Sequence, residues 1–204
     1  MPQERRIPTQ KRSREKYDLI LATAKELIGE RGNDSVSMRE IAKQAGLAIS
    51  SIYQYFPDKN AILEAIMQNY FDKIRELISR FLSDCKTIED FQNGLSVGMD
   101  MFYLLFKQEP ALATLWAGIQ ANTELKELDA EDSRINSTLI TEAFVSIFPN
   151  IHEEDIYGAI LLLLHTAGMT VRLALATPDK DGDKLIEEFK TLATLRLNSL
   201  HIQT

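Results

Sequence analysis

The sequence predicts an all-helical globular protein, and three observations support this prediction. Every long segment has apolar residues at helical spacing, and no run alternates apolar and polar residues as a half-buried strand does. Prolines and glycines that end helices fall between these segments. The 204 residues are 45% hydrophobic and 26% charged, a composition typical of soluble proteins that bury a sizeable core.

The N-terminal end of the chain is basic. Residues 1–12 are polar, and six Lys or Arg lie between positions 5 and 16, which predicts a basic arm leading into a first helix from about Ser13. Residues 1–57 hold 10 Lys/Arg against 7 Asp/Glu, a charge of +3, whereas residues 58–204 hold 13 against 23, a charge of −10. The net charge of −7 is therefore compatible with an N-terminal part that binds DNA.

Two short helices follow the first one. Ser37-Met38-Arg39-Glu40 has the form of a capping box, and the helix that it opens should end at Gly46. A third helix is expected from about Leu47 to Tyr55, and a long amphipathic helix after Pro57. Ala42 stands four residues before Gly46, and Ile52 six residues after it. A helix-turn-helix has this spacing, with a small residue at the crossing and glycine at the turn, although an ordinary helical hairpin shares part of it.

The outer face of the third helix is polar, which suits the major groove of DNA. Gln54 can pair with adenine, and the hydroxyls of Tyr53 and Tyr55 can reach phosphates, although Tyr55 also neighbours the apolar face and is equally a core candidate. Ser37 either caps its helix, contacts a phosphate, or does both. Lys59 lies beside the third helix and can bind the same DNA backbone.

Together these residues resemble a known family, the TetR family of transcription regulators. The resemblance covers about residues 13–64 and is carried by Ser37-Met38-Arg39-Glu40-Ile41-Ala42, Ala45-Gly46-Leu47, Ser51-Ile52-Tyr53-Gln54-Tyr55-Phe56, Asp58-Lys59 and Ala61-Ile62-Leu63. It implies a DNA-binding domain over residues 13–60 and an all-helical effector-binding and dimerisation domain over residues 61–204. The expected DNA-contacting residues are Lys11, Arg12, Arg14, Ser37, Arg39, Ala48, Ile49, Ser50, Ser51, Tyr53, Gln54, Tyr55 and Lys59.

Some of these residues have an alternative interpretation or depart from the family pattern. The N-terminal cations could follow the duplex or enter its minor groove, but they could also be a solvated charge run. Ile49 stands where the family commonly has a polar or basic residue, and Ser50 where glycine or alanine is frequent. Ile49 either reads a thymine methyl or packs, and Arg39 becomes a candidate reader of guanine.

The rest of the chain predicts longer helices, with Gly182 marking the last turn. The expected ranges are 88–108, 110–120, 125–148, 153–176 and 184–201. Residues 158–176 are nearly all apolar, but His165 and Arg172 interrupt them, and a membrane span needs about 20 uninterrupted residues, so a buried helix is expected. The last two helices are the natural dimer pair, with plain core packing as the alternative; the residues involved are Ile156, Ala159, Ile160, Leu163, Ala167, Leu185, Phe189, Leu192, Arg196 and Leu200.

Met and aromatic side chains of these helices could wall a pocket for a largely apolar effector. His165 and Arg172 could anchor a polar group of the effector, but His165 could instead bond a backbone carbonyl and Arg172 could pair with an acidic residue. The expected ligand-binding residues are Met99, Phe102, Phe106, Trp116, Phe144, Phe148, His165, Met169 and Arg172.

The predicted function is sequence-specific regulation of transcription, as a cytoplasmic homodimeric repressor released from a palindromic DNA operator by a small molecule. A non-specific architectural DNA-binding protein is the alternative. An enzyme is not expected, because the three histidines lie far apart and no nucleophile or paired-carboxylate motif stands out. No cofactor, metal or membrane is expected either. Cys85, the one cysteine, cannot form an internal disulfide and is expected to be a buried, inert thiol.

Overall fold

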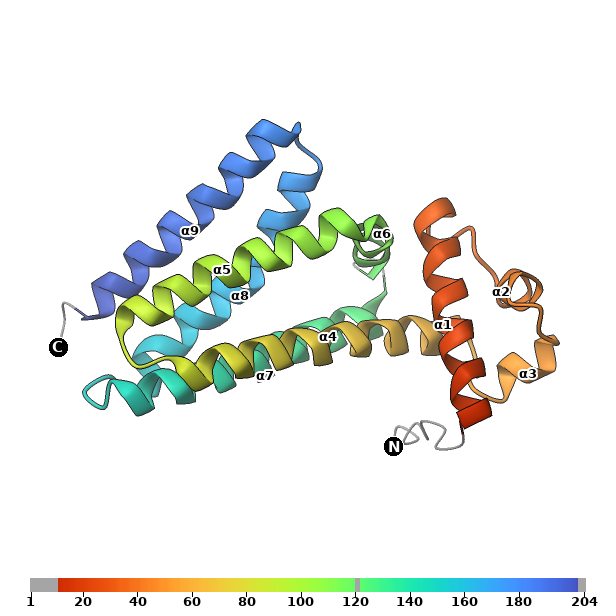
Figure 1. The fold of residues 1–204 in the computed structure, drawn as a ribbon, viewed down its shortest axis with the longest axis horizontal. Helices are drawn as coiled ribbons and strands as arrows, with labels where there is room; N and C mark the ends of the chain where they lie inside the picture. Colours follow the sequence, from red (N-terminus) through yellow and green to blue (C-terminus); the bar gives the residue numbers. More distant parts are fainter. Residues whose placement is uncertain (1–10, 120–121, 202–204) are drawn as a thin grey trace. The chain divides into compact units, whose positions relative to one another are not determined.

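The computed structural model describes residues 11–119 and 122–201, and all regular structure in this part of the chain is α-helical, which confirms the predicted fold class. The first helix begins at Lys11, two residues earlier than predicted, so the predicted arm lies outside the described residues except for its last two positions. In chain order (Figure 1) the helices are α1 (Lys11–Arg31), α2 (Met38–Gln44), α3 (Ile49–Tyr53), α4 (Lys59–Asp84), α5 (Ile88–Gln108), α6 (Pro110–Ile119), α7 (Thr123–Ile147), α8 (Glu153–Leu175) and α9 (Asp179–His201).

The chain divides into two compact units. The first consists of residues up to Asn69 together with residues 110–125, so it is larger than the predicted DNA-binding domain and includes α6. Helix α6 packs against α1, where small residues allow a close approach. A Cβ atom added to Gly29 would lie only 2.7 Å from the Cβ of Ala111. The fully buried residues Ile20, Ile41 and Ile52 tie α1, α2 and α3 into one core.

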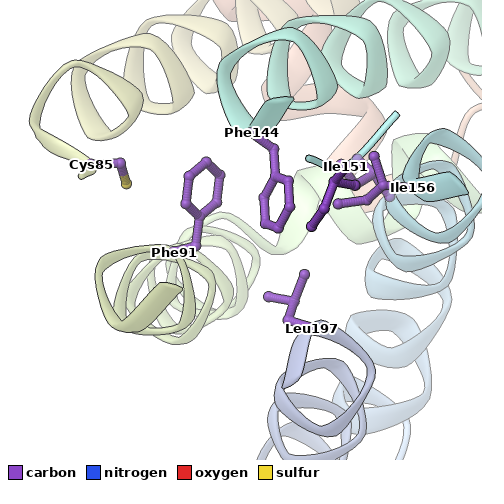
Figure 2. Packing of buried hydrophobic residues seen from close by; sticks show 7 residues of the cluster. Cys85, Phe91, Phe144, Ile151, Ile156 and Leu197 are labelled. Atoms are coloured by element: carbon purple, nitrogen blue, oxygen red, sulfur yellow. The ribbon is translucent and has the colours of Figure 1, made fainter. Parts of the chain in front are cut away.

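The second unit consists of Tyr70–Glu109 and the residues from Lys126 onward. Its helices α5, α8 and α9 lie side by side in Figure 1 and pack pairwise. Figure 2 shows the aromatic centre of its core, where the rings of Phe91 and Phe144 are 4.9 Å apart in an edge-to-face arrangement, with Leu197 of α9 close by. Cys85 is buried at this cluster, as predicted, and burial raises the pKa of its thiol to about 11. The thiol is therefore protonated at neutral pH.

Gly182 does not mark the last turn, and that prediction is wrong. Helix α9 begins at Asp179, so Gly182 lies within its first turn, where its N–H donates to the carbonyl oxygen of Pro178 at 2.9 Å. A Cβ atom at this position would lie 2.5 Å from the backbone oxygen of Ala174 in α8. The glycine is therefore explained by the close packing of α8 against α9 rather than by a turn.

Helix α8 is buried on one side only. It is long and apolar enough to cross a membrane by length and composition alone, and 17% of its most apolar stretch is buried within one chain. Ile156, Ile160, Val171 and Ala174 face the core, as expected for a buried helix. The opposite side is exposed and still apolar, with Leu162 64% and Leu173 57% exposed, so the prediction of a buried helix is only half right.

Candidate nucleic-acid interface

Helices α2 and α3 form the predicted helix-turn-helix, and its turn explains the glycine. Gly46 has a φ of +66°, a left-handed conformation that favours glycine. Its N–H donates to the carbonyl of Lys43 at 3.3 Å, and the N–H of Leu47 donates to the carbonyl of Ala42 at 3.0 Å. These two bonds form the Schellman motif that ends α2. Ala42 and Ile52 are buried between the two helices, as their spacing predicted.

The predicted capping box at the start of α2 is confirmed. The backbone N–H of Glu40 donates to the hydroxyl of Ser37 at 3.3 Å, while the backbone N–H of Ser37 donates to the Glu40 carboxylate at 2.8 Å. The hydroxyl of Ser37 also donates to this carboxylate, at 2.8 Å. These hydrogen bonds from Ser37 hold the pKa of Glu40 below its ordinary value. Ser37 is exposed but already engaged, so a DNA phosphate would have to compete with Glu40 for it.

Helix α3 presents a polar face to solvent. Its only fully buried residue is Ile52, which points toward α2. Tyr53 is 53% exposed, and three of its neighbours, Ala48, Ser50 and Gln54, are exposed as well. Ile49 and Ser51 are half-buried, so each has part of its surface available and part in contact with the domain. The face predicted to read DNA is thus accessible.

Tyr55 differs from Tyr53 in having internal partners. Its hydroxyl lies 2.9 Å from the hydroxyl of Ser13 in α1. Its ring meets the ring of Tyr17 edge to face, and Tyr17 in turn stacks on Phe56 at 4.9 Å. Tyr55 therefore ties the end of the helix-turn-helix to α1, and its contact with a phosphate stays a prediction.

Lys59, the first residue of α4, also has an internal partner. Its ammonium donates to the carbonyl oxygen of Asn33, between α1 and α2, at 2.7 Å. An ammonium has three N–H donors, so this bond leaves two for a phosphate. The Asp58 carboxylate accepts the backbone N–H of Ala61 at 2.8 Å and caps the same helix.

Three exposed cations, Lys11, Arg12 and Arg14, lie in the first turn of α1, which has no acidic residue. Positive charge at a helix N-terminus opposes the helix dipole, so it costs a little helix stability. Their contact with DNA stays a prediction, with a solvated charge run as the alternative. Lys43 on α2 is exposed as well and lies one helical turn after Arg39, the predicted guanine reader.

Four of the aromatic residues predicted to line a ligand pocket form two ring pairs within the second unit. Phe144 is buried and contacts Phe148 with ring centroids 4.7 Å apart, and Phe102 meets Phe106 at 5.1 Å. Met99 is buried on the same helix as Phe102 and Phe106. Trp116 is buried too, but on α6 in the first unit. The ring contacts lie within the second unit, whereas Trp116 belongs to the first, and the role of these residues in binding a ligand stays a prediction.

The remaining predicted ligand residues lie on α8. His165 is exposed, Met169 is 54% exposed, and an N–H of the Arg172 guanidinium donates to the sulfur of Met169. Within one chain His165 therefore needs no buried partner, and its contact with an effector stays a prediction. A shallow depression does exist in this unit, but its lining residues all come from α7 and include none of the predicted ones: Glu131, Arg134, Ile135, Thr138, Leu139 and Glu142.

Within residues 11–119 and 122–201, no group of three or more His, Cys, Asp or Glu side chains is placed to hold a metal ion.

Comparison with protein families identifies both parts of the chain. Residues 20–66 match the family described as bacterial regulatory proteins, tetR family. Residues 89–200 match the family described as tetracyclin repressor-like, C-terminal domain, which alone covers more than half of the chain. The first match includes the helix-turn-helix. The second runs from α5 into α9 and so includes α6, although α6 packs within the first unit.

Individual relatives agree with the family assignment. The chain is 30% identical to a fatty acid metabolism regulator protein of Bacillus subtilis over 166 residues, 80% of this chain and 78% of that protein. It is 35% identical to the HTH-type transcriptional regulator YvdT of the same organism over 101 residues, about half the length of each protein. Among solved structures, the fatty acid degradation regulator FadR of Bacillus halodurans has the same fold, with a TM-score of 0.69 and 22% identity over 88% of this chain and 94% of that chain. The chain belongs to the TetR family, a family of DNA-binding transcriptional regulators and not of enzymes.

Proposed function

We propose that this protein is a homodimeric repressor, which binds a palindromic operator in the bacterial cytoplasm and leaves it when a small apolar effector binds. The observation that carries the proposal is the exposed polar face of α3 on a complete helix-turn-helix. A face of small and hydrogen-bonding side chains is suited to the major groove, where base edges are read. The protein would then read sequence, unlike an architectural DNA-binding protein.

In this proposal two residues carry most of the base recognition. The amide of Gln54 pairs with adenine, and the guanidinium of Arg39 pairs with guanine. Tyr53 and the two free donors of Lys59 bind phosphates and hold the reading face in register. The cations of the first turn of α1 add sequence-independent affinity that falls as salt rises.

The dimer is proposed from the outward face of α8 and α9. Leu162 and Leu173 on α8, with Leu192 and Leu195 on α9, are each more than half exposed although all are apolar. Exposed apolar patches of this kind mark interaction sites, and a helix pair packed against its own copy makes a four-helix interface. A symmetric dimer would present two reading heads for half-sites about 34 Å apart.

The effector acts by binding the DNA-free conformation better than the DNA-bound one. To move that conformation from rare to dominant, its preference must be about 10⁴-fold. The relative of 30% identity is named a fatty acid metabolism regulator, and this likeness favours genes of fatty acid metabolism as the regulated set.

DNA recognition is tested with duplexes from the gene's own upstream region and with scrambled duplexes at fixed salt. We expect Gln54→Ala to lose about 1–3 kcal/mol of discrimination at one base pair. Lys59→Met should weaken binding to every sequence and lower the salt slope by about one. Gln44→Ala is the matched control, an exposed glutamine at the end of α2 outside the reading face. Equal affinity for both kinds of duplex would instead support the architectural alternative.

The dimer is tested by placing charge on the proposed interface. Leu162→Glu combined with Leu192→Glu should give a monomer in sedimentation and abolish tight operator binding. Leu104→Glu is the control, because Leu104 is 51% exposed but lies on α5. If the control dissociates the protein as well, or the double variant stays dimeric, the interface is not on α8 and α9.

A further inference from the structure

A buried polar network joins α4 to α7 within the second unit. The Arg75 guanidinium of α4 donates to one oxygen of the Asp132 carboxylate on α7. The amide nitrogen of Asn136, one turn further along α7, donates to the other oxygen at 2.8 Å. Asp132 is 8% exposed and Asn136 4% exposed, so both side chains are withdrawn from bulk water.

Two atoms of this network are left over. The Nε of Arg75 and the Oδ1 of Asn136 are buried, and neither finds a hydrogen-bond partner among the described residues. The Asp132 carboxylate is an acceptor, so it fixes the Asn136 amide with its N–H toward Asp132 and its oxygen turned away. Buried polar atoms of folded proteins nearly always have a partner. One unused donor and one unused acceptor therefore remain on the two side chains that bond Asp132, and they call for an occupant.

The charges around the two atoms select the kind of occupant. Asp132 neutralises Arg75, and the exposed Asp72 adds a second carboxylate 3.4 Å from the same guanidinium. An anionic group at Arg75 Nε would lie close to the Asp132 carboxylate, and a cationic group at Asn136 Oδ1 would lie close to the guanidinium. Burial raises the pKa of Asp132 despite the neighbouring Arg75, so this part of the unit already disfavours charge.

We propose that Arg75 and Asn136 bind an uncharged hydrogen-bonding group, a hydroxyl or a carboxamide, of an otherwise apolar effector. Such a group accepts from Arg75 Nε, donates to Asn136 Oδ1, and adds no charge beside Asp132. This assignment deepens the proposed function, on which it depends, by naming the polar group of the effector. If α4 and α7 are placed to share this group in only one of the two conformations, the effector binds that conformation better, as a shift between them requires.

The site is tested with four probes that share one aromatic ring: benzyl alcohol, benzamide, benzoate and benzylammonium. Each is titrated into the full-length protein while the side-chain N–H resonances of Arg75 and Asn136 are followed by NMR. We expect benzyl alcohol and benzamide to shift both resonances to saturation, and the two charged probes to bind at least tenfold more weakly. This comparison uses the wild-type protein, so it does not depend on a variant that folds.

A variant and a matched control locate the effect. Asn136→Leu keeps the side-chain volume but removes the acceptor, and it should weaken benzyl alcohol binding about tenfold, the effect of one lost hydrogen bond. Thr141→Val should leave binding unchanged. Thr141 also carries a buried hydroxyl without a partner in the described residues, but it lies about 140° around α7 from Asn136.

Each other outcome overturns the assignment. Tighter binding of a charged probe, or equal binding of all four, contradicts an uncharged site. No shift with any probe means that the two atoms hold buried water only. Operator binding by the wild-type protein is measured in parallel, without any probe. If the wild-type protein binds the operator but none of the probes, this site alone is rejected. If the wild-type protein does not bind the operator, the proposed function is rejected.

Discussion

Replacing Gly46 by alanine tests the turn of the helix-turn-helix by a single methyl group. The Cβ would meet nothing within 4 Å, so the substitution adds no clash. Its whole effect comes from the backbone, because the φ of +66° is strained for any residue with a side chain. Gly98→Ala is the matched control: it too has no atom within 4 Å, but it lies in the middle of α5 at helical φ.

The two substitutions should therefore change the free energy of unfolding in opposite directions. A left-handed alanine costs about 1–2 kcal/mol, and the stiffer unfolded chain offsets about 0.4–1 kcal/mol of that cost. The net loss for Gly46→Ala is then on the order of 0.5–1 kcal/mol of unfolding free energy. Gly98→Ala should instead gain about 0.5–1 kcal/mol, because glycine is unfavourable within a helix.

Urea unfolding can be followed by two signals, tryptophan fluorescence, which reports the first unit alone, and circular dichroism, which reports the helices of the whole chain. The chain has one tryptophan, Trp116, which is buried within the first unit, so its fluorescence reports the unit that contains Gly46. With a urea slope of about 1–3 kcal/mol per M, Gly46→Ala should lower the fluorescence midpoint by a few tenths of a molar unit. Gly98→Ala, in the second unit, is followed by circular dichroism and should raise the midpoint. A Gly46→Ala variant as stable as the wild type would refute the left-handed turn.

Three further predictions concern single contacts. Hydrogen bonds from the N-cap serine hold the pKa of Glu40 below 4.5, so its carboxylate stabilises the fold above that pH and loses this effect as the pH falls through the lowered pKa. Glu40→Gln should therefore be less stable than the wild type at neutral pH, and the difference in unfolding free energy, followed by Trp116 fluorescence, should shrink in acid. A difference that does not change with pH contradicts the capping role of the charge. Tyr55→Phe and Ser13→Ala should each cost about 0.5–1.5 kcal/mol and together less than their sum, and additive losses in a double-mutant cycle would mean that the two hydroxyls do not interact. Gly182→Ala should destabilise the second unit by more than about 1 kcal/mol in thermal unfolding, because its Cβ would lie 2.5 Å from a backbone oxygen; an unchanged melting temperature argues against that close approach.

The helix-turn-helix could be predicted from the sequence because its determinants are local. Ala42, Gly46 and Ile52 lie within eleven residues, and their spacing reflects steric requirements that any such turn has to meet. For Ser37 the sequence alone does not distinguish a helix cap from a phosphate contact. The capping role is now established by its bonds to Glu40.

Other features depend on contacts between distant segments, and the sequence did not reveal them. Gly182 looked like a turn residue because the proximity of Ala174 cannot be read from neighbouring positions. His165 looked like a buried polar residue because the apolar residues around it were assigned to the core, whereas that side of α8 is exposed. Asp132 and Asn136 stand in a polar stretch that resembles a solvated helix face, so no pattern singled them out.

A dimer built on the exposed leucines of α8 and α9 would link the state of the protein to its concentration. If this face pairs with a second copy, mass action makes the apparent stability rise as more chains are present. Dilution would then favour free protomers, each of which has a single reading head and an uncovered apolar surface. Under these conditions the amount of regulator in the cell would itself help to set how much of the operator is occupied, before any effector binds.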